Sequence, residues 1–135
     1  DAQRQKRGVN LIPLGQSALS VVRCLKRGEF LGLLADRDFS DRNDRVPFFG
    51  HPARIPLGPA VMAFRTGAPV LPTFIVRQVD DTFLLRLHAP LYPELYDSPE
   101  ALRKKICRIL EKEIGEHPYQ WFIFDDFWGN TVEQQ

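Results

Sequence analysis

The stretch FLGLLADRDFSDRNDRVPFFGHPARIPLGPAVMAFRTGAPVLPTFIV, residues 30–76, decides the predicted fold. Its first apolar run, FLGLLA, predicts a buried strand that ends at Asp36, and its last, PVLPTFIV, predicts a second strand. A charged loop and a small-residue helix, PAVMAFRTG, which Gly58 and Pro59 open, lie between the two strands. This order forms a βαβ-like unit, and open α/β sheets bind ligands at the carboxyl ends of their strands. Asp36 is therefore expected at such an end.

Elements on both sides of this stretch complete the predicted architecture. Apolar side chains at helical spacing predict a helix over residues 16–28 with Gly28 as its C-cap, after a short strand in the segment VNLIPL. The segment TFLLRLH predicts a strand that pairs with the preceding one through the turn QVDD, at the edge of the sheet. Ser98 predicts the N-cap of a further helix whose apolar stripe faces the sheet. Together these elements predict an α/β fold, a partial open sheet with flanking helices.

The composition is that of a globular domain. A chain of 135 residues with 44% hydrophobic residues can bury one modest core. The net charge of +1 argues against a general nucleic-acid binder, because such domains carry a stronger basic excess. No apolar run approaches the roughly 20 residues that a membrane-spanning helix needs. Cys24 and Cys107 lack the paired spacing of a zinc site and are predicted to be buried free thiols, which suit a reducing cytoplasm.

Two loops separate the first predicted strand from the helix. The charged loop begins with the acid spacing of a calcium loop, but Asp41 stands where that loop needs Gly and Pro47 where it needs Glu. We therefore predict no metal, and a solvated loop in which Asp36 alone is held by a strand end. The following segment, PFFGHPARIPLG, predicts an irregular but packed loop, because its prolines and glycines interrupt regular structure.

Four blocks of the sequence, in this order and spacing, resemble a known family. The blocks LLADRD, PFFGHPAR, PLGPAVMAFRTGAPVLP and HPYQWFIFDDFW resemble the bacterial lipid A biosynthesis acyltransferases, and equally the phosphatidylinositol mannoside acyltransferases. The resemblance implies the αβα fold of the glycerolipid acyltransferases. It also implies transfer of a fatty acyl group from a thioester of acyl carrier protein or coenzyme A to a hydroxyl of a glycolipid such as a lipid A precursor. No metal or redox cofactor is implied.

The family's activating motif, a His followed five positions later by Asp or Glu, is missing. The positions five residues after the three histidines hold Pro56, Pro93 and Phe122. The resemblance therefore implies that residues 1–135 form the carboxyl-terminal part of a single acyltransferase domain. Its amino-terminal half, which supplies the catalytic His, is then a partner of this part. The isolated chain is expected to show no acyl transfer.

The resemblance also assigns candidate site residues. Asp36 matches the acid that orients the catalytic imidazole, and Arg4 matches an Arg held near the site, with Arg7 as the alternative. Arg54, in the HPAR turn, matches a position at which related acyltransferases bind phosphate. The other predicted substrate contacts come from the same stretch: Phe48, Phe49 and Gly58.

Two segments near the carboxyl end bear on membrane contact. One is a basic face of the last predicted helix, formed by Arg103, Lys104, Lys105 and Arg108. This face is either solvated surface or a contact with anionic lipid headgroups. The other is YQWFIFDDFW, which is either a strand that buries Trp121 and Phe124 or an aromatic membrane interface. The family resemblance places this portion peripherally at the cytoplasmic face of the bacterial inner membrane.

The acceptor and the function class have alternatives. Asp125 and Asp126 stand where the family commonly has basic residues before the final Trp, which leaves the acceptor headgroup open. The acceptor could instead be a phospholipid or an aminoacyl lipid. In a different class, the chain could be a non-catalytic lipid-binding or regulatory module of a fusion protein. A His-x-x-x-x-Asp/Glu motif elsewhere in the parent protein separates the enzyme from the module.

Overall fold

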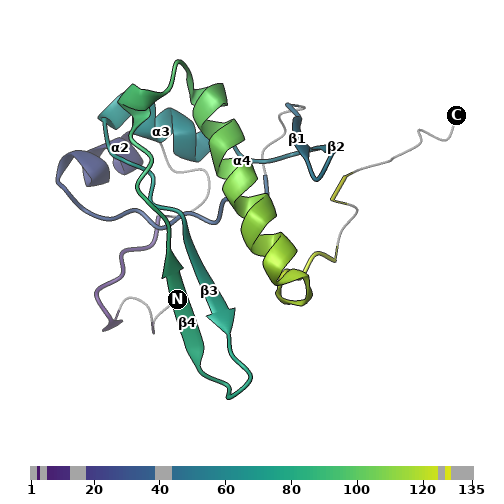
Figure 1. Cartoon of the computed structure of the whole chain (residues 1–135). Helices are drawn as coiled ribbons and strands as arrows, with labels where there is room; N and C mark the ends of the chain where they lie inside the picture. Colours follow the sequence, from purple (N-terminus) through teal and green to yellow (C-terminus); the bar gives the residue numbers. More distant parts are fainter. Residues whose placement is uncertain (1–2, 4–5, 13–17, 39–43, 125–126, 129–135) are drawn as a thin grey trace, which may run out of the picture. The chain divides into compact units, whose positions relative to one another are not determined.

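The computed structural model describes residues 3, 6–12, 18–38, 44–124 and 127–128. These residues belong to two compact units, Asp1–Gly32 and Leu33–Gln135, and each is described by itself. The first unit contains helix α2 (Ala18–Lys26). The elements of the second unit are, in order, β1 (Val46–Phe48), β2 (His51–Ala53), α3 (Gly58–Thr66), β3 (Thr73–Arg77), β4 (Phe83–Leu87), the 3₁₀ turn η1 (Pro93–Leu95), α4 (Pro99–Glu116) and the 3₁₀ turn η2 (Pro118–Gln120) (Figure 1).

Helix α2 confirms the helix predicted for the first unit, including its end. Gly28 has φ +76°, and its N–H donates to the Leu25 carbonyl at 3.0 Å. The N–H of Glu29 donates to the Cys24 carbonyl at 3.2 Å, which completes a Schellman motif. Cys24 is buried and free, as predicted. The described part of the predicted first strand, residues 9–12, forms no strand.

The buried strand predicted at residues 30–35 is wrong. This run has no strand pairing, and the side chains of Phe30 and Leu34 are 97% and 86% exposed. A strand needs a hydrogen-bonded neighbour, and neither sheet of the described residues includes this run. The βαβ-like unit is therefore not found in the described part of the chain. Asp36 follows a segment without regular secondary structure.

The first sheet of the described residues is a hairpin in the segment predicted to be an irregular loop. Strands β1 and β2 pair antiparallel from Val46↔Ala53 to Phe48↔His51. Phe49 and Gly50 connect them with φ values of 50° and 77°, the pair of positive values that a type I′ turn requires. Two prolines face each other in the middle pair of the register, which by alternation is the pair without ladder hydrogen bonds. Their missing N–H groups therefore cost nothing, and the prediction of irregular structure is wrong.

The second sheet confirms the predicted pairing of two apolar strands. Strands β3 and β4 pair antiparallel through the predicted turn. Asp81, at φ 64°, closes this turn, and its N–H donates to the Gln78 carbonyl at 3.1 Å. The hairpin is a sheet of its own in the described residues, so its predicted place at the edge of a larger sheet is wrong. One of its two faces is apolar and exposed, with Ile75, Phe83, Leu85 and Leu87.

Helix α4 lies at the centre of the core of the second unit. Ser98 accepts the Ala101 N–H at 3.2 Å, so the predicted N-cap is confirmed. The apolar stripe of α4 packs against α3 and β1, and not against an open sheet. Its buried apolar side chains are Leu102, Ile106, Cys107, Leu110 and Ile114. The small side chains of Ala60 and Ala63 in α3 are buried in the same core, and Figure 1 shows α4 running between the two hairpins.

The aromatic block near the carboxyl end forms no strand in its described residues. Trp121 is half-buried, and its ring meets the ring of Phe48 edge to face with centroids 5.9 Å apart. Phe124 is 86% exposed, so the alternative in which a strand buries it is wrong. The Trp128 indole N–H donates to the Phe48 carbonyl at 3.1 Å. Asp125 and Asp126 lie outside the described residues.

Helices and small antiparallel sheets are mixed in the described part of the chain, as in a small α/β domain. A search of these residues finds no helix that combines the length and the apolar character needed to cross a membrane. The same residues contain no group of three or more His, Cys, Asp or Glu side chains placed to hold a metal ion.

Candidate active site

Asp36, the predicted orienting acid, is held by the carboxyl-terminal aromatic segment. The Trp121 indole Nε1–H donates to Asp36 Oδ2 at 3.3 Å, across 85 positions of sequence. The neighbouring Arg37 donates a hydrogen bond to the main-chain carbonyl of Phe122. These two bonds position the carboxylate in place of the strand that the sequence predicted. A carboxylate accepts through both oxygens, so a second donor such as an imidazole N–H can bind Oδ1.

The aromatic core fixes the indole that holds Asp36. The Trp121 ring packs against Phe127 with centroids 5.2 Å apart, and against Phe48. Phe48 has 0% exposure, so the indole rests on a fully buried ring. Sequence reasoning did not predict a role for Trp121 at the site. The aromatic block was one of the four that carry the family resemblance, and that was the available signal.

The predicted substrate contacts lie in different environments. Phe48 is buried, whereas Phe49 is 40% exposed and its ring lies edge to face on Phe48 at 4.9 Å. The Phe49 N–H donates to Glu111 Oε1 at 2.6 Å, which fastens the β1–β2 turn to α4. Arg54 is exposed directly after β2, and Gly58 is exposed at the start of α3. The substrate roles of all four residues stay predictions.

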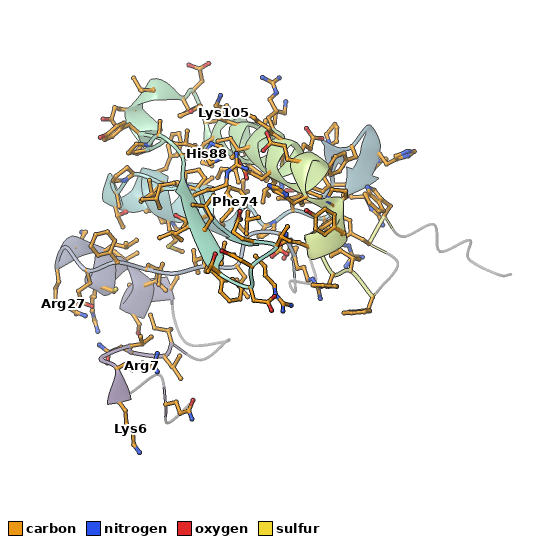
Figure 2. All side chains as sticks on the ribbon, turned by 60° about the horizontal axis from the view of Figure 1, so that its bottom comes forward. Lys6, Arg7, Arg27, Phe74, His88 and Lys105 are labelled. Carbon is orange, nitrogen blue, oxygen red and sulfur yellow. The ribbon has the colours of Figure 1, made fainter. Side chains whose placement is uncertain are left out.

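Besides Asp125 and Asp126, two more residues considered from the sequence are not located by the structure. Arg4 and Asp41 lie outside the described residues, so the catalytic role of Arg4 and the solvation of Asp41 stay predictions. Arg7, the alternative to Arg4, is exposed and belongs to the first unit (Figure 2). Asp36 belongs to the second unit.

The charged loop is less solvated than expected at its carboxyl end. Arg103 Nη1 donates to Asp44 Oδ2 at 2.6 Å, and Nη2 donates to Oδ1 at 3.3 Å. The Arg103 side chain is only 7% exposed, because it projects from the buried side of α4. The basic face predicted for this helix is therefore wrong for Arg103. It is confirmed for Lys104, Lys105 and Arg108, which are exposed.

A polar network that the sequence did not predict joins β4 to α4. Glu113, with 2% side-chain exposure, places Oε1 2.7 Å from His88 Nε2 and 3.2 Å from Arg86 NH2. Arg86 also reaches Glu116 Oε2 at 2.8 Å, and this hydrogen bond is the main cause that lowers the pKa of the Glu116 carboxyl. The Phe74 ring lies edge to face on the His88 imidazole, with centroids 5.5 Å apart (Figure 2). The network fastens the hairpin to the helix.

Comparison with known proteins agrees with the motifs. A family model described as bacterial lipid A biosynthesis acyltransferase matches residues 2–129. The chain belongs to this family. The match includes both Asp36 and the aromatic segment that holds it.

Curated relatives are acyltransferases by name. A phosphatidylinositol mannoside acyltransferase of Mycobacterium tuberculosis strain CDC 1551 / Oshkosh is 39% identical over 132 residues, which is 93% of this chain and 40% of that protein. The protein of the same name from strain H37Rv is 45% identical over 107 residues, 77% of this chain and 32% of that protein. The one from Mycolicibacterium smegmatis is 29% identical over 99 residues, 71% of this chain and 31% of that protein.

These findings confirm the resemblance to the lipid A and phosphatidylinositol mannoside acyltransferases and make the chain a member of an acyltransferase family. The chain spans between 31% and 40% of the length of these relatives. The activity of the whole protein is therefore a matter for proposal.

Proposed function

We propose that this chain is the carboxyl-terminal part of an O-acyltransferase of the αβα glycerolipid-acyltransferase type. It moves a fatty acyl group from a thioester of acyl carrier protein or coenzyme A to a hydroxyl of a glycolipid. The family match over residues 2–129 is the observation that supports this proposal. We propose a phosphatidylinositol mannoside as the acceptor, because the three curated relatives are named for it. A lipid A precursor is the alternative.

In the proposed reaction, the base is an imidazole from a His-x-x-x-x-Asp/Glu motif elsewhere in the protein. It removes the proton of the acceptor hydroxyl, whose oxygen attacks the thioester carbonyl. The tetrahedral oxyanion then collapses, and the thiol leaves with the proton. Asp36 accepts the other imidazole N–H through Oδ1 while Trp121 holds Oδ2, so the carboxylate stabilises the protonated ring. No metal or redox step is part of the proposal.

The other site residues keep their predicted roles in this proposal. Arg4 positions the acid or the substrate, and Arg54 contacts a phosphate group of the substrate. Phe49 and Gly58 contact the acyl or lipid part, with Phe48 beneath Phe49.

We also propose that the protein works at the cytoplasmic face of the bacterial inner membrane. The exposed cations Lys104 and Arg108 of α4 support contact with anionic headgroups, each adding about 1 kcal/mol near such a surface.

The proposal is tested by Asp36→Asn in the full-length protein. The amide keeps the size of the side chain but removes the charge that stabilises the protonated imidazole, so kcat is expected to fall about 10⁴-fold. Asp81→Asn is the matched control, because Asp81 is an exposed acid in the β3–β4 turn, and kcat is expected to change less than about tenfold. Steady-state kinetics with an acyl thioester and a glycolipid acceptor measure both.

A second variant tests the positioning by Trp121. Trp121→Phe keeps an aromatic ring on Phe48 but removes the N–H donor to Asp36. We expect kcat to fall less than in Asp36→Asn, with the KM of both substrates unchanged. Near-normal kcat in Asp36→Asn contradicts the mechanism, and an inactive Asp38→Asn beside it shifts the orienting role to Asp38. Robust acyl transfer by the isolated chain contradicts the proposal that the catalytic base comes from another part of the protein.

A further inference from the structure

A pocket of about 320 Å³ opens between β1 and α4. Its lining residues are Val46, Pro47, Lys104, Cys107, Arg108 and Glu111. Val46 and Cys107 are 3% and 2% exposed and form an apolar floor, whereas Lys104 and Arg108 are exposed at the rim. The volume lies within the range of pockets that bind small organic molecules.

The two cations at the rim are placed as a pair. Lys104 and Arg108 are four residues apart on α4, so both side chains project from the same side of the helix. Like charges at this spacing destabilise a helix, and within the described residues neither forms an ion pair. By contrast, Arg77, Arg86 and Arg103 of the same unit are all paired with carboxylates. Other cations of this unit, such as Arg54, Arg65 and Lys112, also form no ion pair with a described residue, so Lys104 and Arg108 are distinguished by lining the pocket together.

The pocket's other ionisable groups offset only part of this charge. Glu111 is the one acid in the lining, and its Oε1 is engaged by the Phe49 N–H at 2.6 Å. Burial raises the pKa of the Cys107 thiol to about 11, so the thiol is neutral near pH 7. Two cations and one engaged carboxylate therefore leave the pocket with a net positive charge.

We infer that this pocket binds the phosphodiester of a phospholipid headgroup. The Lys104 ammonium and the Arg108 guanidinium donate charge-assisted hydrogen bonds to phosphate oxygens, and the apolar floor accepts the carbon skeleton beside the phosphate. The choice of a lipid as the source of the phosphate rests on the proposed function. The anion pocket itself rests on the two cations and the floor alone.

The test is calorimetric titration of the purified protein with glycerophosphoinositol, a soluble phosphodiester headgroup, with inositol and inorganic phosphate as comparison ligands. Glycerophosphoinositol is expected to bind, inositol not to bind, and inorganic phosphate to bind more weakly because it does not use the apolar floor. The double variant Lys104→Gln with Arg108→Gln is expected to weaken binding of glycerophosphoinositol at least about tenfold, since it removes both charged donors.

Lys105→Gln is the matched control. Lys105 is an exposed cation of the same helix (Figure 2) that does not line the pocket, so its loss should change the affinity less than about twofold. Helix content by circular dichroism shows whether each variant is folded. If the double variant is unfolded, the single variants Lys104→Gln and Arg108→Gln take its place, each expected to weaken binding more than Lys105→Gln does.

Three results overturn the inference. The first is a loss of affinity in Lys105→Gln equal to that in the double variant, which would show general charge attraction. The second is an affinity for inorganic phosphate equal to that for glycerophosphoinositol, which would show a free-phosphate site. The third is no binding of glycerophosphoinositol. Acyl transfer is measured separately in the full-length protein. Headgroup binding without acyl transfer supports the inferred pocket and contradicts the proposed function. Acyl transfer without headgroup binding supports the proposed function and contradicts the inferred pocket.

Discussion

The two hairpins beside α4 differ in how many of their apolar side chains they bury. The β1–β2 hairpin, with its prolines and glycine, places Val46, Phe48 and Ala53 in the core at 3%, 0% and 0% exposure. The β3–β4 hairpin, with ordinary apolar strands, buries Val76 but leaves its outer apolar side chains exposed. The exposed fractions are 67% for Ile75, 68% for Phe83, 56% for Leu85 and 60% for Leu87. Apolar content alone therefore does not predict which hairpin carries the core.

In the second hairpin, polar contacts to α4 and η2 add to the burial of Val76. Glu113 of α4 binds Arg86 of β4 and His88, which directly follows this strand. On the other strand, the Gln120 side-chain amide pairs with the backbone of Arg77, accepting its N–H at 2.9 Å and donating to its carbonyl at 3.0 Å. Removing a buried side chain from the β1–β2 hairpin should therefore lower the free energy of unfolding much more than removing one from the exposed face of the β3–β4 hairpin.

The largest expected difference is between two Phe→Ala substitutions. Phe48→Ala empties a fully buried site between α4 and the aromatic segment and is expected to cost about 3–5 kcal/mol. Phe83→Ala, at a ring that is 68% exposed, is expected to cost less than about 0.5 kcal/mol. Urea denaturation of the purified protein measures both. Similar losses at the two positions would show that the exposed face of β3–β4 is covered in solution.

A smaller difference is expected between two ion pairs. Asp44→Asn leaves the Arg103 guanidinium, 7% exposed, without its anion. We expect a loss of about 1–3 kcal/mol, below that of a fully buried pair because Asp44 is itself 44% exposed. Asp81→Asn breaks the exposed pair with Arg77 and should cost less than about 0.5 kcal/mol, since Asn tolerates the positive φ at this position. The same denaturation series measures both, and equal losses contradict the burial of Arg103.

The smallest difference concerns the two turns. Gly50→Ala in the β1–β2 turn is expected to cost about 1 kcal/mol, because Gly50 has φ +77°. No atom lies within 4 Å of the added Cβ, so the loss comes from backbone strain alone. Asp81→Gly relieves the same kind of backbone strain in the β3–β4 turn, but it also raises the conformational entropy of the unfolded chain. The net change in the free energy of unfolding should therefore stay within about 0.5 kcal/mol. Thermal melts check both, and a larger loss at residue 81 reverses the expected order.

Local signals explain which elements could be predicted. The ends of α2 and α4 follow from Gly28 and Ser98, and the β3–β4 pairing follows from two apolar runs around a short turn. The β1–β2 hairpin could not be predicted in this way, because proline usually interrupts a strand. Whether Pro47 and Pro52 do so depends on the register, which places them opposite each other.

The order and spacing of the motifs were enough to assign the family, because the family depends on residue identities along the chain. The same motifs predict the role of Asp36, which stays a prediction. Only the tertiary structure decided how Asp36 is held. Its carboxylate meets Trp121 across 85 positions, and Asp44 meets Arg103 across 59. The predicted strand at residues 30–35 was wrong for the same physical reason. A strand and a long-range hydrogen bond both need a partner from elsewhere in the fold, and local patterns carry no information about which segments pack together.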